Sequence, residues 1–207
     1  MMTVGSETIR AWESQEHVFE KVPKESNGVV SGQDASETAI RLFRRHYDEV
    51  FRYCVHRLFN RTDAEDVTST VFLQVVKYLP RFRGDDPQLR GWLFRIATNT
   101  INTHLRRRRK HRRLLETAAQ QAVEQVVAPS PSDELARQKA LLKQAMLQLK
   151  ARHQTVIALR FFEKMSSAEI AEILGGSPGT IRSQVSRALV QLRKKMRTVE
   201  TLVSPEV

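Results

Sequence analysis

The sequence predicts an all-α protein with two helical domains joined by a flexible linker. Three observations support this fold class. Apolar residues recur at intervals of three and four in successive segments, which is the spacing of helices with one buried face. Glycine is sparse, with 8 in 207 residues, and no Gly-rich phosphate loop is present, so a nucleotide-binding α/β enzyme has little support. The prolines of Ala128–Pro131 interrupt the helical pattern and divide the chain in two.

The positive charge of the chain is concentrated in the same two parts. The formal net charge of +11 arises from +10 over residues 36–113 and +8 over 132–197, offset by acidic segments between and outside them. We therefore expect five segments. They are a mostly disordered arm over 1–35 with room for a short helix at Ile9–Phe19, a first domain over 36–113, a linker over 114–131, a second domain over 132–197 and a tail over 198–207.

The first domain is predicted to begin with a helix between Glu37 and Phe59. Its buried face comprises Ala39, Leu42, Phe43, Tyr47, Val50, Phe51, Cys54 and Leu58. Cys54 lies on this face, so we expect it to be a core residue rather than a nucleophile. As the only cysteine it forms no internal disulfide and offers no zinc cluster, so we expect a reducing compartment and neither a metal nor a cofactor.

A second helix is predicted to begin with Thr62 as its N-cap and Glu65 completing a capping box. Asp63 and Asp66 would lie in its positive first turn. Its predicted buried residues are Val67, Val71, Phe72, Val75, Val76 and Leu79. Pro80 would end this helix, and residues 81–88 (RFRGDDPQ) would form a turn.

A third helix is expected to follow and to end in a strongly basic run. Its predicted buried side comprises Trp92, Leu93, Ile96, Ala97, Ile101 and Leu105, and beside it lie Arg95, Thr98, Asn99, Asn102 and Thr103. Residues 106–113 (RRRRKHRR) then place seven Lys or Arg in eight positions. This exceeds what the negative end of a helix dipole requires, and its self-repulsion favours a polyanionic partner. The run therefore predicts nucleic-acid contacts rather than a solvated tail or a membrane surface.

The second domain is predicted to contain two amphipathic helices followed by a sharply capped short one. The first covers residues 135–149, with Leu135, Leu142, Met146 and Leu149 on its apolar side, and the second contains Val156, Ile157, Leu159, Phe161 and Phe162. Ser166 and Glu169 form a capping box at the start of the short helix. The buried side of the short helix would be Ile170, Ala171, Ile173 and Leu174.

A glycine turn and a long helix complete this domain. Gly175 and Gly176 can adopt the left-handed conformation that ends a helix, and Ser177 with Pro178 is a typical start for the next. Short helix, glycine turn and long helix form a helix-turn-helix. The long helix would bury Ile181, Val185, Ala188, Leu192 and Met196 and would expose Thr180, Arg182, Ser183, Ser186 and Arg187. Hydroxyl and guanidinium groups on that face predict base contacts in a major groove.

Together the two domains resemble a bacterial sigma factor of the extracytoplasmic-function (ECF) group, whose compact members carry only conserved regions 2 and 4. The resemblance rests on residues 63–72 (DAEDVTSTVF), 82–85 (FRGD), 92–99 (WLFRIATN) and 167–187 (SAEIAEILGGSPGTIRSQVSR). Their order, with only a short linker between the halves, is more specific than either half alone. The resemblance implies a protein that is no enzyme itself but binds core RNA polymerase, directs it to promoters and helps to open the duplex.

The resemblance also implies three sets of site residues and a further partner. Core polymerase would contact Asp63, Asp66 and Phe72. The minus-ten element, as an unstacked single strand, would contact Phe82, Arg83, Gly84, Asp85, Asp86, Arg95, Asn99, Asn102, Arg106, Arg107, Arg108 and Arg109. The minus-thirty-five duplex would be read by Thr180, Arg182, Ser183, Ser186 and Arg187. An anti-sigma factor is the further partner that the family implies.

Two other classes of protein remain open on the residues alone. A stand-alone helix-turn-helix regulator binding duplex DNA would explain the second domain but leaves the helix from Trp92 to Arg113 unexplained. An RNA-binding protein or helical nuclease would explain the charge, but a nuclease needs clustered carboxylates for metal, and Asp85 with Asp86 fits turn chemistry better.

The sequence also bears on location. It contains no basic leader followed by an apolar run and no stretch of about 20 apolar residues, so we expect neither export nor a membrane span. The expected location is the bacterial cytoplasm, with attachment to the membrane only through an anti-sigma factor.

Overall fold

The computed structural model describes residues 32–116 and 134–203, which are helical apart from short connections. In chain order the elements are α2 (Gly32–Leu58), α3 (Arg61–Tyr78), the 3₁₀ turn η2 (Leu79–Arg81), α4 (Asp86–Glu116), α5 (Glu134–Leu147), α6 (Ala151–Ile157), the π-helical turn η3 (Ala158–Phe162), α7 (Ser167–Leu174) and α8 (Pro178–Val203). The all-α fold class is confirmed. The predicted helix at Ile9–Phe19 and most of the predicted linker lie outside the described residues.

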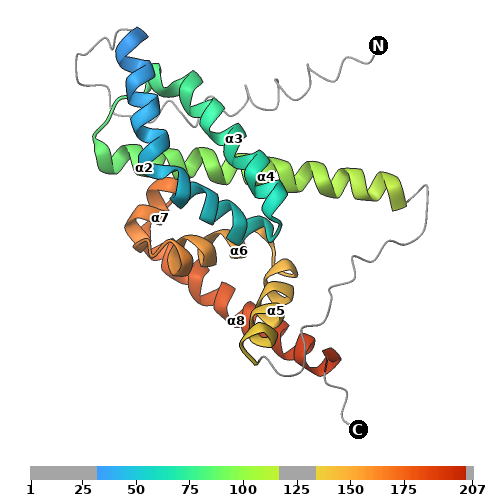
Figure 1. The fold of residues 1–207 in the computed structure, drawn as a ribbon. Coiled ribbons are helices and arrows are strands. Elements are labelled where there is room, and N and C mark those ends of the chain that lie inside the picture. The colour runs from blue at the N-terminus through green and yellow to red at the C-terminus, as the bar shows by residue number, and fades with distance from the viewer. Residues whose placement is uncertain (1–31, 117–133, 204–207) are drawn as a thin grey trace.

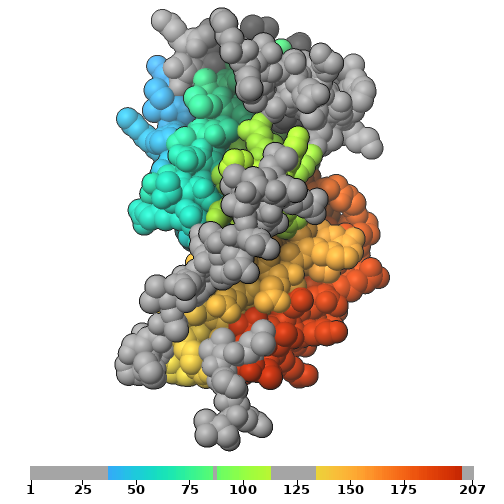
Figure 2. Space-filling view, turned by 90° about the vertical axis from the view of Figure 1, so that its right-hand side faces the viewer, coloured from blue at the N-terminus to red at the C-terminus, as the bar shows by residue number. Residues whose placement is uncertain are grey.

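The helices form two groups that pack against each other (Figure 1). In the first helical group, α3 packs on both α2 and α4, and in the second helical group, α5, α6 and α7 all pack on the long α8. The two groups meet where α4 contacts α7 and where α2 contacts η3. Figure 2 shows the first group stacked directly on the second.

The core of the first helical group is formed by side chains from all three helices. Tyr53 and Cys54 of α2 and Phe94 of α4 have no exposed surface. The rings of Tyr53 and Phe94 lie 5.3 Å apart between centroids, and the Tyr53 hydroxyl shares a 2.9 Å hydrogen bond with the hydroxyl of Thr98. The prediction of Cys54 as a core residue is therefore confirmed. Burial raises the pKa of its thiol to about 11 and so keeps it protonated and unreactive.

Helix α3 begins two residues earlier than predicted. Asn60 is its N-cap, since the Asn60 side chain accepts a 3.0 Å hydrogen bond from the backbone N–H of Asp63. The predicted capping box on Thr62 is wrong, and Glu65 instead accepts a 3.0 Å hydrogen bond from Nε of Arg61. Asn is the stronger N-cap of the two, but the spacing from Thr62 to Glu65 matches a capping box and so favoured Thr62 in the sequence.

Replacing Asn60 by Ala should lower the free energy of unfolding by about 1 kcal/mol, because it leaves an amide in the first turn of α3 without its acceptor. Thr62→Ala is the matched control and should change stability by less than about 0.5 kcal/mol. Urea denaturation followed by circular dichroism measures both variants. Equal losses in the two would contradict the assignment of Asn60 as the cap.

Three predicted core residues are largely exposed. Val76 of α3 is 59% exposed and Phe43 of α2 is 45% exposed. Val76 lies three residues after the exposed Leu73, on a side of α3 that no other described helix covers. Phe161 is 49% exposed, because it belongs to the π-helical turn, where the usual spacing of 3.6 residues no longer decides which side chains face inward.

The ends of α5 and α8 also differ from expectation. Leu135 lies in the first turn of α5, ahead of the first buried residue of that helix, Leu141, and is 60% exposed. Helix α8 continues to Val203, past the point at residue 197 where a tail was predicted. Val199 is buried, so part of this added length is covered by other residues.

The helix-turn-helix has the predicted local structure. The side chains of Ser166 and Glu169 cap each other's backbone N–H groups, which confirms the capping box at the start of α7. Gly175 and Gly176 have φ values of 73° and 121°, a conformation in which a side chain would be strained. Oγ of Ser177 accepts a 3.1 Å hydrogen bond from the N–H of Thr180 and caps α8.

Candidate nucleic-acid interface

The loop before α4 is a tight turn held by aromatic and polar contacts. The ring of Phe82 packs on that of Trp92, with 5.1 Å between centroids. A Cβ added to Gly84 would lie 2.8 Å from the Phe82 ring, which is too close. Glycine at this position therefore allows the Phe82 ring to pack against the backbone of residue 84. The carboxylate of Asp85 accepts a 3.0 Å hydrogen bond from the N–H of Gln88 at the start of α4. Predicted site residues Phe82, Gly84 and Asp85 therefore shape the turn itself.

Arg83 and Asp86 are the other two predicted site residues of this loop. The guanidinium of Arg83 donates to the backbone oxygens of Pro80 and Phe82, at 2.8 and 2.9 Å. Asp86 is the first residue of α4, and its side chain lies outside the described residues.

Three predicted site residues lie along one side of α4. Arg95, Asn99 and Asn102 follow one another at steps of four and three, so they form one stripe on the helix. All three are half-buried. Arg95 donates to the backbone oxygen of Glu172 in α7, and Asn102 accepts a 3.0 Å hydrogen bond from Arg57. Arg95 therefore contacts the second helical group directly, whereas Asn102 is held by Arg57 of α2 within the first group.

The basic end of α4 is mostly open to solvent. Arg106, Arg107 and Arg109 are exposed, whereas Arg108 is only partly exposed. Nη1 of Arg108 donates a 2.5 Å hydrogen bond to the carboxylate of Asp63 in α3. The carboxyl-terminal part of α4 extends past the other helices of its group (Figure 1). Arg106, Arg107 and Arg109 are therefore available to a polyanion, while Arg108 also ties α4 to α3.

The exposed face of α8 carries the predicted base-reading residues. Arg182, Ser183, Ser186 and Arg187 are exposed, while Ile181 and Ala188 on the opposite side have no exposed surface. The hydroxyl of the fifth predicted residue, Thr180, lies 3.0 Å from the Ser177 hydroxyl, so this side chain partly serves the start of the helix.

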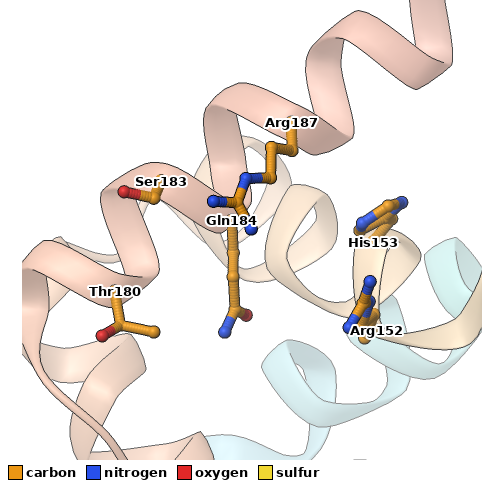
Figure 3. Close-up of a pocket in the computed structure, with 6 residues that line it drawn as sticks. All are labelled: Arg152, His153, Thr180, Ser183, Gln184 and Arg187. Carbon is orange, nitrogen blue, oxygen red and sulfur yellow. The ribbon is translucent and has the colours of Figure 1, made fainter.

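A shallow hollow beside this face brings in two residues that the sequence reasoning missed. Arg152 and His153 of α6 line it together with Thr180, Ser183, Gln184 and Arg187 of α8 (Figure 3). Burial, followed by the charges of Arg152 and Lys150, lowers the pKa of His153. The sequence did contain one signal for Arg152 and His153. Both lie in the first turn of α6, where a positive charge is unfavourable for the helix, so a basic pair at this place indicates an external anionic partner.

The predicted polymerase-binding residues of α3 lie in unlike surroundings. Asp63 pairs with Arg108, and Asp66 is exposed. Phe72 is only 6% exposed, because its ring packs 4.9 Å from that of Phe43 and 6.0 Å from that of Tyr47. A partner could touch little of the Phe72 ring.

Apolar side chains are exposed next to that aromatic cluster. Leu73 is 71% exposed and Val76 59% exposed on α3, and Ile40 and Phe43 of α2 are about half exposed. Val76 and Phe43 were predicted to be core residues. The helical spacing of apolar residues and their hydrophobicity do not distinguish a core position from a position at which a partner docks.

A polar network centred on Glu49 connects the two helical groups. Arg90 donates from Nε to Oε1 of Glu49 at 2.9 Å, and its Nη1 lies 3.4 Å from a carboxylate oxygen of Glu169 in α7. His46 lies 3.2 Å from the other oxygen of Glu49. Burial alone would raise the pKa of Glu49, but the hydrogen bonds and charges of His46 and Arg90 outweigh burial and hold the pKa at about 2.

This depressed pKa predicts a loss of stability in acid. An unfolded Glu has a pKa of about 4.3, so the Glu49 network stabilises the folded chain fully above that pH and loses its effect as the pH falls toward 2. In Glu49→Gln the stability should therefore fall less steeply between about pH 4.5 and 2. Urea midpoints measured across that range test this. If the stability of Glu49→Gln falls with pH as steeply as that of the wild type, other carboxyl groups govern the acid transition.

Comparison with protein families identifies the two helical groups. The Sigma-70 region 2 family matches residues 42–111, and the Sigma-70 region 4 family matches residues 145–194. An ECF RNA polymerase sigma factor of Mycobacterium tuberculosis, SigL, is 32% identical over 169 residues, covering 79% of this chain and 93% of the relative. The chain is an ECF sigma factor. The sigma factor YlaC of Bacillus subtilis is 33% identical over 157 residues, covering 75% of this chain and 90% of the relative.

Two solved structures share the fold of this chain. CnrH, solved with the cytosolic domain of CnrY, is 26% identical with a TM-score of 0.57, and 82% of this chain and 96% of CnrH are covered. RpoE of Bartonella quintana, solved with the anti-sigma factor NepR, is 23% identical with a TM-score of 0.58 over 76% of this chain and 95% of RpoE.

Membership of the family establishes the function in outline. As an ECF sigma factor with regions 2 and 4, the protein is not an enzyme; it binds RNA polymerase and promoter DNA and directs transcription initiation. Within the described ranges, no helix is long and apolar enough to cross a bilayer. Over the same residues, no group of three His, Cys, Asp or Glu could hold a metal ion.

Proposed function

We propose that α8 reads the minus-thirty-five element of the promoter as duplex DNA. The observation that carries this proposal is the exposed face of α8, a helix capped at its start by Ser177, on which Arg182, Ser183, Ser186 and Arg187 stand opposite a buried apolar side. Side chains of this kind hydrogen-bond to base edges in a major groove. Arg152 and His153 lie beside that face and would contact phosphates, which position a helix without reading sequence.

The minus-ten element would bind the first helical group as a single strand. The Phe82–Asp86 turn would receive an unstacked base, and the stripe Arg95, Asn99 and Asn102 would contact base edges. The exposed arginines of the run Arg106–Arg109 would follow the phosphates of the displaced strand. The first helical group would therefore constitute the region 2 domain and the second the region 4 domain, with bounds near 36–113 and 132–197.

Core polymerase would dock on the outer face of α3. Asp63 and Asp66 supply carboxylates there, and exposed Leu73 and Val76 supply an apolar surface beside them. Phe72 would act by supporting Phe43 from behind, because its ring is buried against that of Phe43. Exposed apolar groups rimmed by charge are typical of protein interfaces.

An anti-sigma factor is the further partner that we infer. The solved relatives RpoE and CnrH are complexes with NepR, an anti-sigma factor, and with the cytosolic domain of CnrY. By analogy, this chain would act in the bacterial cytoplasm and reach the membrane only through such a partner.

Replacing Asn99 by Ala tests the single-strand site. The variant holoenzyme should form closed complexes normally but open the promoter at least about tenfold more slowly, because the amide meets its base only after that base leaves the stack. Permanganate footprinting of the minus-ten region measures opening, and gel shift measures closed complexes. A promoter with a mismatched minus-ten bubble removes the melting cost but keeps the base contact, so it should rescue the variant only in part.

Three other results of the Asn99→Ala experiment would change the role assigned to Asn99. Full rescue by the bubble would assign Asn99 to melting instead of base capture, and unchanged opening of duplex promoter would refute the site. A lower melting temperature of the free variant by circular dichroism would make Asn99 a structural residue.

A further inference from the structure

Val190 is an exposed apolar side chain on α8. It is 56% exposed, while Ile181 and Ala188 on the buried side of the same helix have no exposed surface. Among the residues that the structure describes, Val190 belongs to neither hydrophobic core. A single exposed valine is common on protein surfaces, so the position of Val190 has to decide whether it has a function.

The direction of Val190 coincides with that of the proposed base-reading residues. At about 100° per residue, the four exposed reading residues of α8 span an arc of about 140° around the helix, from Arg182 to Arg187. Val190 lies about 80° from Arg182, near the middle of that arc. It also lines a second shallow hollow on α8 together with Arg182 and Ser186. A major groove that receives the reading residues would therefore receive Val190 as well.

Val190 also lies close enough to these residues to reach the same stretch of duplex. It follows Ser186 by about one turn, or about 6 Å at ~1.5 Å per residue. Since each base pair rises ~3.4 Å, Val190 would meet the groove floor roughly two base pairs from the pair that Ser186 contacts. The distance from Arg182 to Val190 along the axis is about 12 Å. That distance is comparable with the width of the major groove, ~12 Å.

Beyond Val190 the same face of α8 becomes basic. Arg193, Lys194 and Arg197 are exposed and lie about 20°, 120° and 60° around the helix from Arg182. Cations at these positions suit phosphates, which position a helix on the duplex without reading its sequence. Val190 is thus the last residue of this face before the phosphate-contacting part, and its neighbours on the face are polar or charged.

The chemistry of Val190 selects one feature of the major groove. Its isopropyl group neither donates nor accepts a hydrogen bond, so it cannot pair with the polar edge of a base. Thymine is the one base that presents a methyl group in this groove, and apolar side chains pack against that methyl. Cytosine at the same place would put its amino group against Val190 and deprive that donor of water.

We propose that Val190 is a specificity-determining residue that packs against the C5-methyl group of one thymine in the minus-thirty-five element. This inference rests on the proposed reading of duplex DNA by α8. Burial of one methyl group changes affinity by roughly fourfold, which sets the size of the expected preference.

Promoter duplexes in which deoxyuridine replaces one minus-thirty-five thymine at a time test the methyl contact. Deoxyuridine pairs as thymine does and lacks only the C5-methyl group. At one position, the wild-type holoenzyme should bind the modified duplex about fourfold more weakly than the unmodified promoter, as measured by competition gel shift. That thymine should lie within roughly three base pairs of the pair whose preference is lost in Arg187→Ala.

Val190→Thr and Val190→Ser form a matched pair, because both introduce a hydroxyl group and they differ by one methyl group. Val190→Thr should retain a penalty of at least about twofold for deoxyuridine, whereas Val190→Ser should bind the two duplexes within about 1.5-fold of each other. Leu147→Ala controls for lost apolar surface, since Leu147 of α5 is 48% exposed and lies on another helix. This control should keep the full penalty of the wild type.

Several outcomes would overturn the role of Val190. They are a penalty that persists in Val190→Ser, the absence of any deoxyuridine penalty in the wild type, and a loss of core polymerase binding in Val190→Ser without DNA. If Arg187→Ala still loses its base preference in these cases, the reading function of α8 stands and only Val190 is excluded. If Arg187→Ala also ranks promoters as the wild type does, the failure lies in the proposed reading function itself.

Discussion

Replacing Arg106, Arg107 and Arg109 together by Gln should reduce the affinity of the holoenzyme for single-stranded minus-ten DNA by roughly 50-fold at 0.15 M salt. Each phosphate contact to a single strand adds about 0.7 to the slope of log affinity against log salt. Three lost contacts should therefore make the slope shallower by about 2, and the difference should vanish near 1 M salt. Arg108 is left intact because it binds Asp63.

The matched control removes three cations from the far end of the first helical group. Arg41 and Arg44 of α2 and Lys77 of α3 are exposed, and Lys77 lies 14 residues after Asp63, or roughly 21 Å along α3 from the start of the helix where Arg108 binds. Arg41→Gln, Arg44→Gln and Lys77→Gln should leave the salt slope unchanged. A salt slope equally reduced in both triple variants would show that net charge, rather than the basic end of α4, governs binding.

Replacing Arg187 by Ala should abolish the preference for one base pair of the minus-thirty-five element. A guanidinium that reads a base edge contributes about 1 to 3 kcal/mol of discrimination, or roughly 5- to 150-fold between the preferred and other bases. Arg187 is exposed on the reading face of α8 and lines the hollow beside it (Figure 3). Transcription from a set of single-substitution promoters with the variant holoenzyme measures the preference.

Arg197→Ala provides the control for this experiment, because Arg197 is exposed on the same helix nearly three turns further along. It should weaken all promoters alike without changing their order. If Arg187→Ala also leaves the order unchanged, Arg187 contacts only phosphate or solvent. Binding to core polymerase should be unaffected in both variants.

Local signals in the sequence were sufficient for much of the fold. The capping box of Ser166 and Glu169 and the turn of Gly175 and Gly176 depend only on neighbours in the chain, and both are present. The cap of α3 differs from the prediction because Thr62 and Glu65 match the capping-box spacing, while the helix is capped by Asn60.

Features that depend on packing could not be predicted in the same way. Val76 and Phe161 have the apolar character of core residues, but the neighbouring helices leave both exposed. Tyr53 and Phe94, which have no exposed surface, were missing from the predicted core because helices that are covered on several sides bury more than one stripe.

In the candidate site too, features set by one helix could be predicted and contacts between helices could not. Periodicity identified the stripe of α4 and the face of α8, since both follow from positions within one helix. Periodicity could not indicate that Arg57 reaches Gln154 or that Arg95 reaches Glu172, because those pairs join residues 97 and 77 positions apart. Long-range contacts of this kind are decided by how the helices pack.

The most direct test adds the purified full-length protein to core RNA polymerase and genomic DNA and sequences the 5′ ends of the transcripts. Transcripts should start at defined positions, each preceded by a shared minus-ten and a shared minus-thirty-five sequence. Arg187→Ala should lose the preference in the upstream sequence, and Asn99→Ala should lose yield at the same starts. Transcripts no more defined than those of core polymerase alone, together with tight sequence-specific binding of the free protein to duplex DNA, would contradict the account and favour a stand-alone regulator.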